Sequence, residues 1–150
     1  MKRSETLFCL LTIASLVAAA PARDNALIVN SGSTNTVGYK ISLWSDGTAS
    51  VTTQRRDGSA ASTPKSFNVP SATTARFFSN LAAARAGNVV SVPCMKSASF
   101  GTTTHVTWHG WTSPDLDCPP KDSLGQALEK DVQEIVKAAG ISSVPLRQLK

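Results

Sequence analysis

Two spans of strand-like alternation, each followed by a helical pattern, constrain the fold of this chain more than any other feature. The clearest alternation covers residues 39–53, where apolar and polar side chains alternate on both sides of Asp46-Gly47. Asp-Gly favours a tight turn because glycine accepts positive φ without penalty. We therefore expect a β-hairpin here, with residues 65–69 as a third strand. The apolar residues 26–29 predict either a short strand or an exposed leader.

The first helical pattern follows the hairpin. Apolar side chains recur at helical spacing over residues 72–86. Ser71 has the hydroxyl of a good N-cap, and Gly87 stands where a C-cap glycine belongs. The pattern predicts a helix whose apolar side covers one face of the sheet.

The second unit repeats this order. Residues 89–116 alternate again and carry turn signals at Gly101 and Gly110, which predicts a three-stranded meander. A second helical pattern covers residues 124–139, with Ser123 at the head of a capping box.

Two units of this kind indicate an α+β fold. We expect an antiparallel sheet built from two hairpin or meander units, with two helices packed on one face. The other face of such a sheet is open to water or to a partner. Residues 23–140 are long enough for a single domain, and residues 141–150 have no clear period and predict a loose C-terminal tail.

Residues 1–22 have the order that is typical of a cleaved secretory signal peptide. Two basic residues precede an apolar run over residues 7–20, and residues 20–22 (APA) offer a small-residue cleavage site. The run is shorter than the ~20 residues that a bilayer-spanning helix needs. We therefore expect a mature chain that begins near Arg23, has no transmembrane segment and is secreted or periplasmic.

The mature chain contains two cysteines, Cys94 and Cys118. An even count in an oxidising compartment predicts one disulfide between them. A zinc pair and a reactive thiol are the alternatives. Structural zinc sites use Cys-x-x-Cys or histidine spacing, which is missing here.

The basic excess of the chain is scattered. The formal net charge is +5, yet the adjacent pair Arg55-Arg56 lies in a stretch rich in Gly and Ser. Nucleic-acid binding needs a basic patch or stripe, so this distribution predicts a solvated surface and no nucleic-acid partner.

No residue pattern in the sequence predicts catalysis. His105 and His109 would lie roughly 13 Å apart along one strand, too far to share a metal ion. The Gly-x-Ser-x-Gly nucleophile elbow is missing as well. We therefore expect no catalytic residue, no metal ligand and no cofactor.

The three tryptophans, Trp44, Trp108 and Trp111, lie near the ends of predicted strands. Tryptophan combines a large apolar area with a hydrogen-bond donor, which suits it to anchoring a partner. The alternative is that these side chains cap a small core, and we favour that reading for Trp108. Trp44 and Trp111 are the candidates for a partner surface.

Residues 94–101 (CMKSASFG) and 113–118 (SPDLDC) resemble small secreted bacterial proteins of unknown function, which share a C-x-K-S-x-S-F-G … S-P-D-L-x-C pattern. The resemblance implies the same hairpin and helix, the same cysteine pairing, and a bacterial periplasm or medium as the compartment. It carries no catalytic residue across.

These observations lead to two expectations for function. The first is a secreted or periplasmic, non-catalytic domain that binds another envelope or extracellular molecule, either a protein or a polysaccharide. The second is a small secreted hydrolase with a site that the sequence does not reveal.

Overall fold

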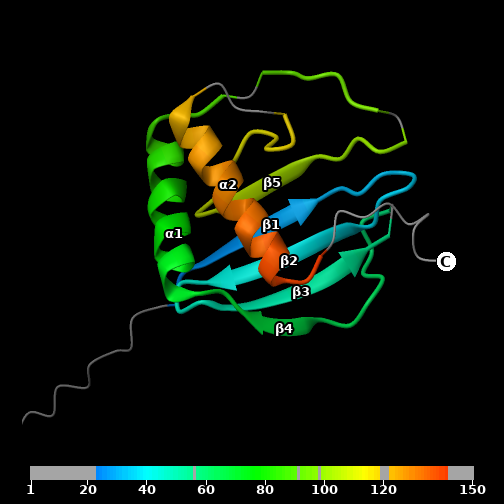
Figure 1. Cartoon of the computed structure of the whole chain (residues 1–150), viewed down its shortest axis with the longest axis horizontal. Helices are drawn as coiled ribbons and strands as arrows, with labels where there is room; N and C mark the ends of the chain where they lie inside the picture. The colour runs from blue at the N-terminus through cyan, green and yellow to red at the C-terminus, as the bar shows by residue number, and fades with distance from the viewer. Residues whose placement is uncertain (1–22, 56, 91, 98, 119–121, 142–150) are drawn as a thin grey trace, which may run out of the picture.

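The computed structural model describes residues 23–55, 57–90, 92–97, 99–118 and 122–141. Its strands form one antiparallel six-stranded sheet in the order β4-β3-β2-β1-β5-β6. Helices α1 (Ser71–Ala86) and α2 (Ser123–Ala138) lie on the same face of this sheet (Figure 1). The α+β prediction, with an antiparallel sheet and two helices, is confirmed.

Strand β1 (Asn25–Asn30) lies in the middle of the sheet. It pairs with β2 (Gly38–Trp44) on one side and with β5 (Thr104–Trp108) on the other. Its side chains alternate, with Ala26 and Ile28 fully buried. The apolar run over residues 26–29 is therefore a central strand and not an exposed leader.

The predicted hairpin is present as β2 and β3 (Thr48–Gln54). Gly47 in its turn has a φ of 87°, and a Cβ at this position would lie 2.8 Å from the carbonyl oxygen of Val69. Glycine is needed here both for the backbone conformation and for the close approach of that chain segment. Strand β4 (Lys65–Asn68) then pairs with β3, as the sequence predicted.

Both helix N-caps differ from the prediction, whereas Gly87 is the C-cap of α1 as predicted. In α1, Ser71 is already helical and Pro70 is the N-cap, with no side-chain hydrogen bond. The fixed φ of proline presets the chain for helix entry without a capping hydroxyl. In α2 the N-cap is Asp122, whose carboxylate accepts a hydrogen bond from the backbone N–H of Gly125 at 2.7 Å. Ser123 therefore does not head a capping box.

An ion pair joins the two helices. Asp131 of α2 is only 1% exposed, and its carboxylate accepts hydrogen bonds from Arg76 Nε at 2.6 Å and Asn80 Nδ2 at 2.7 Å, both on α1. Arg76 also bonds Glu134, one turn further along α2. A buried carboxylate is tolerated only when it is paired, so this contact fixes how the helices align.

The core lies between the helices and the sheet. Its largest fully buried apolar side chains come from α1, α2 and the three strands β1, β2 and β5, and they form one cluster. These side chains are Phe77, Leu81, Leu128, Ile135, Ile28, Ile41, Leu43 and Val106.

The predicted meander over residues 89–116 is wrong in its first strand. Among the described residues of this range, β5 and the two-residue β6 (Trp111–Thr112) are the strands that form, and residues 92–97 belong to no strand, helix or turn. Alternation is not sufficient for a strand, because a strand also needs a neighbour, and the free side of β5 is already taken by β6. The expected disulfide between Cys94 and Cys118 is present.

Two sequence predictions fall outside the described residues: the signal peptide over residues 1–22 and the tail, of which only Ile141 is described. Neither described helix is long and apolar enough to cross a membrane.

Candidate functional site

The two tryptophans proposed as a partner surface lie on opposite faces of the sheet. Trp44 follows the core residue Leu43 in β2, so its side chain is on the face away from the helices. Trp111 pairs with Trp108 across β5 and β6, and both pack against the core on the helix-covered face. The two therefore cannot belong to one contact surface.

Trp44 contributes to a polar open face. The Arg23 guanidinium lies 5.9 Å from the centre of its ring, within the range of a cation–π contact. The strand positions in register with this face carry mostly hydroxyl and short apolar side chains. They are Leu27, Val29, Lys40, Ser42, Ser50, Thr52, His105 and Thr107.

The residues around Trp108 have structural partners. The Trp108 indole N–H lies 3.0 Å from both carboxylate oxygens of Asp24, and His109 Nε2 lies 3.0 Å from one of them. His105 Nδ1 lies 3.0 Å from the Ser113 carbonyl oxygen. Within the part of the chain that the structure describes, no group of three His, Cys, Asp or Glu side chains is placed to hold a metal ion.

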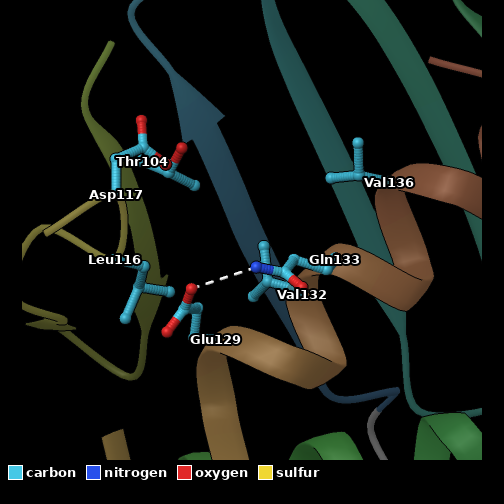
Figure 2. A pocket seen from close by; sticks show the side chains of 7 residues that line it. All are labelled: Thr104, Leu116, Asp117, Glu129, Val132, Gln133 and Val136. Carbon is cyan, nitrogen blue, oxygen red and sulfur yellow. Dashed lines mark hydrogen bonds between the residues drawn. The ribbon is translucent and has the colours of Figure 1, made fainter. Parts of the chain in front are cut away.

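A pocket of about 280 Å³ opens between α2 and the loop that follows β6 (Figure 2). Two carboxylates line it from different elements, Glu129 on α2 and Asp117 on the loop. Glu129 accepts a hydrogen bond from Gln133 at 3.0 Å, and Asp117 accepts one from Thr102. Both carboxylates are thus already engaged by neighbouring side chains.

Tyr39 is 9% exposed and forms a hydrogen bond with Thr104, which lines this pocket. Burial raises the pKa of Tyr39 to about 12, a hydrogen bond with Thr104 opposes the shift, and the nearby Asp117 charge adds to it. A phenol with such a pKa stays neutral in the physiological range, where it can act as a hydrogen-bond donor but not as a base.

The most exposed apolar side chains lie elsewhere, between α1 and β5. Of the six large apolar side chains that are exposed among the described residues, four fall in this connection: Val90, Val92, Met95 and Phe100. Met95 is 101% exposed and Val90 is 67% exposed. The connection runs outside the sheet and both helices (Figure 1). We call residues 92–97 the anchored loop.

The anchored loop is fixed to the domain on both sides of Met95. Cys94 is joined by the disulfide to Cys118, which is 4% exposed. The Lys96 ammonium donates to the Thr102 carbonyl oxygen and pairs with Asp115. A fully exposed apolar side chain is thus held between two attachment points.

Asp115 is itself firmly placed. Its Oδ1 accepts hydrogen bonds from the backbone N–H of Asp117 at 3.0 Å and of Thr104 at 3.2 Å. Burial alone would raise the pKa of Asp115, but these bonds and the Lys96 ammonium outweigh it and hold the pKa below its ordinary value. The carboxylate is therefore charged near neutral pH and keeps Lys96 in place.

The chain was compared with models of protein families, with curated proteins and with solved structures, and none of them matches it.

The anchored loop was not among the predicted sites, because residues 95–100 were interpreted as a strand. One signal in the sequence could have found it. Pro93 directly precedes Cys94, and a proline removes a backbone donor and disfavours a central strand. Met95 follows this Pro-Cys pair and is therefore a candidate for an exposed side chain rather than a buried one.

Proposed function

We propose that the protein is a secreted or periplasmic, non-catalytic domain that binds another extracellular protein through the anchored loop. The observation that carries this proposal is Met95, a fully exposed apolar side chain between two attachment points. Exposed apolar groups that cluster on one segment are typical of contact surfaces. The secretory pattern of residues 1–22 and the disulfide support the location.

A protein partner fits this loop better than a polysaccharide. Its apolar side chains Val92 and Met95 are aliphatic. Burying them against apolar groups of a protein removes them from water, whereas a sugar ring offers few such groups. The resemblance to small secreted bacterial proteins, which we retain as a proposal, makes the compartment a bacterial periplasm or medium.

The pocket of Figure 2 supports the second candidate function, a small secreted hydrolase. Two carboxylates at one pocket are the groups that general acid–base chemistry uses. We rank this candidate lower, because Asp117 and Glu129 already accept hydrogen bonds from Thr102 and Gln133. Turnover of a peptide, ester or glycan substrate that Glu129→Gln abolishes would establish the hydrolase instead.

Affinity capture from the extracellular fluid of the native source tests the binding proposal. We expect the wild-type domain to capture a defined protein, and Met95→Asp to lose it without a change in melting temperature. Trp44→Ala is the matched control on the open face and should retain the partner. Capture that depends on Trp44 and is indifferent to Met95→Asp would place the contact on the sheet and contradict the proposal.

A further inference from the structure

We propose that the partner of the anchored loop is a serine endopeptidase with an apolar primary specificity pocket, which the loop occupies as a substrate would, and that the protein inhibits it. This inference rests on the proposed function, because it names the class of partner for the same loop. Three features of the anchored loop support it: main-chain groups of residues 92–96 that make no backbone–backbone hydrogen bond with a described residue, an outward apolar side chain, and attachment on both sides of one peptide bond.

The backbone of the loop is available for pairing. Between the described residues, no backbone–backbone hydrogen bond involves residues 92–96. Pro93 fixes its own φ and biases Val92 toward extended conformations. A protein that binds an extended segment does so by adding it to a sheet edge through main-chain hydrogen bonds, and endopeptidases hold their substrates in this way.

Met95 and Lys96 point to different environments. Met95 is fully exposed, whereas the Lys96 side chain is 23% exposed and directed toward Asp115. The flexible, unbranched Met95 side chain can fill an apolar slot of the kind that chymotrypsin-like enzymes present. Lys96 is already engaged and cannot fill an acidic pocket. The bond offered to the enzyme is therefore the one between Met95 and Lys96.

The two attachments explain why the loop would inhibit rather than be consumed. Attack of the enzyme's serine oxygen on the Met95 carbonyl carbon forms an ester and breaks the peptide bond, and the serine proton passes to the Lys96 amine. That amine stays beside the ester, because Lys96 is bound to Asp115 and Thr102 while the Cys94 disulfide holds the other end. Its attack on the ester restores the peptide bond and returns the proton to serine, and proximity favours this return over hydrolysis.

A membrane surface is the other class of partner that exposed apolar side chains could contact. Anionic lipid attracts basic side chains next to an apolar segment. The one basic residue of the anchored loop, Lys96, is turned toward Asp115 and is not displayed. The observations therefore favour the endopeptidase.

The test uses chymotrypsin and subtilisin as probes, because they are unrelated folds with apolar primary pockets, and trypsin as the contrast with an acidic pocket. Hydrolysis of a chromogenic peptide is followed as the full mature protein is added. We expect inhibition of chymotrypsin or subtilisin and little of trypsin. Met95→Asp should weaken the inhibition by roughly 30-fold or more, as loss of a central interface residue does. Met95→Lys should transfer inhibition to trypsin.

Two controls keep the outcome interpretable. Met95 is fully exposed, so Met95→Asp and Met95→Lys should have the melting temperature of the wild type. Trp44→Ala should inhibit as strongly as the wild type does. Lys96→Ala leaves the disulfide in place but removes the second attachment. Mass spectrometry should show this variant cleaved after residue 95 much faster than the wild type.

Three results would overturn the inference: no inhibition of either probe by the wild type, inhibition unchanged by Met95→Asp, or rapid digestion of the wild type at Met95. Binding to anionic vesicles that depends on Met95, without inhibition, would overturn it in favour of a membrane surface. The proposed function fails separately. If neither probe is inhibited but partner capture is lost with Met95→Asp, the loop is a contact surface for another class of protein. If Met95→Asp captures the partner as the wild type does, both the binding function of the anchored loop and the inhibition of an endopeptidase are contradicted.

Discussion

Removal of the disulfide gives a stability change that can be worked out from its position. The bond joins residues 24 positions apart in sequence, so it closes a loop of that length in the unfolded chain. The entropy lost by the unfolded chain in such a loop corresponds to about 3.5 kcal/mol at room temperature. An unfolding entropy of about 2.1 cal/mol/K per residue over a domain of this size converts it to a fall in melting temperature of about 14 °C.

The perturbation is Cys94→Ser with Cys118→Ala, which leaves no free thiol and puts a small apolar side chain at the buried position. Thermal unfolding followed by circular dichroism measures the change. Wild-type protein unfolded in the presence of a reductant should melt close to the double variant. A melting temperature within about 2 °C of the oxidised wild type would refute the reasoning, since the link would then not constrain the unfolded chain.

Three further changes follow from the contacts. Arg76→Ala leaves the buried Asp131 carboxylate with Asn80 as its remaining partner and should lower the free energy of unfolding in urea by about 3 kcal/mol; a loss under about 1 kcal/mol would contradict a stabilising role for the ion pair between the two helices. Tyr39 is the one tyrosine, so ultraviolet titration reports on it alone, and its ionisation should centre at about 12 in the folded protein. Because the folded state raises this pKa, Tyr39 makes its full contribution to the free energy of unfolding below pH 10 and loses it as the pH rises toward 12. Ionisation near pH 10 would mean that the phenol is not buried. Trp111→Ala, at the core, should cost about 2 kcal/mol in a urea melt and Trp44→Ala less than about 1, and the reverse order would contradict their assigned faces.

Local signals account for the parts of the fold that the sequence predicted well. The hairpin around Gly47 and the two helices depend on neighbouring residues, and their patterns extend over many positions. The place of residues 26–29 in the sheet depends instead on pairing with β5, about 80 residues away. No local pattern decides between a central strand and an exposed leader, which is why both interpretations were open.

The candidate site shows the same limit. The side chains of Trp44 and Trp111 could be assigned to strand ends, but their faces depend on register across β1 and β5. The alternation around Met95 is real in the sequence, yet Lys96 pairs with Asp115 instead of facing a neighbouring strand. That long-range ion pair converts a strand-like pattern into an anchored loop.

The central claim is that the anchored loop is the contact surface of a secreted binding domain. Site-specific photo-crosslinking tests it most directly, with the crosslinker at Ser97, which is exposed and leaves Met95 intact, and at Lys40 on the open face as the control. In the native extracellular fluid, the account predicts one covalent protein adduct from position 97 that Met95→Asp removes, and none from position 40. An adduct from position 40 alone, or an adduct at position 97 that persists with Met95→Asp, would contradict it.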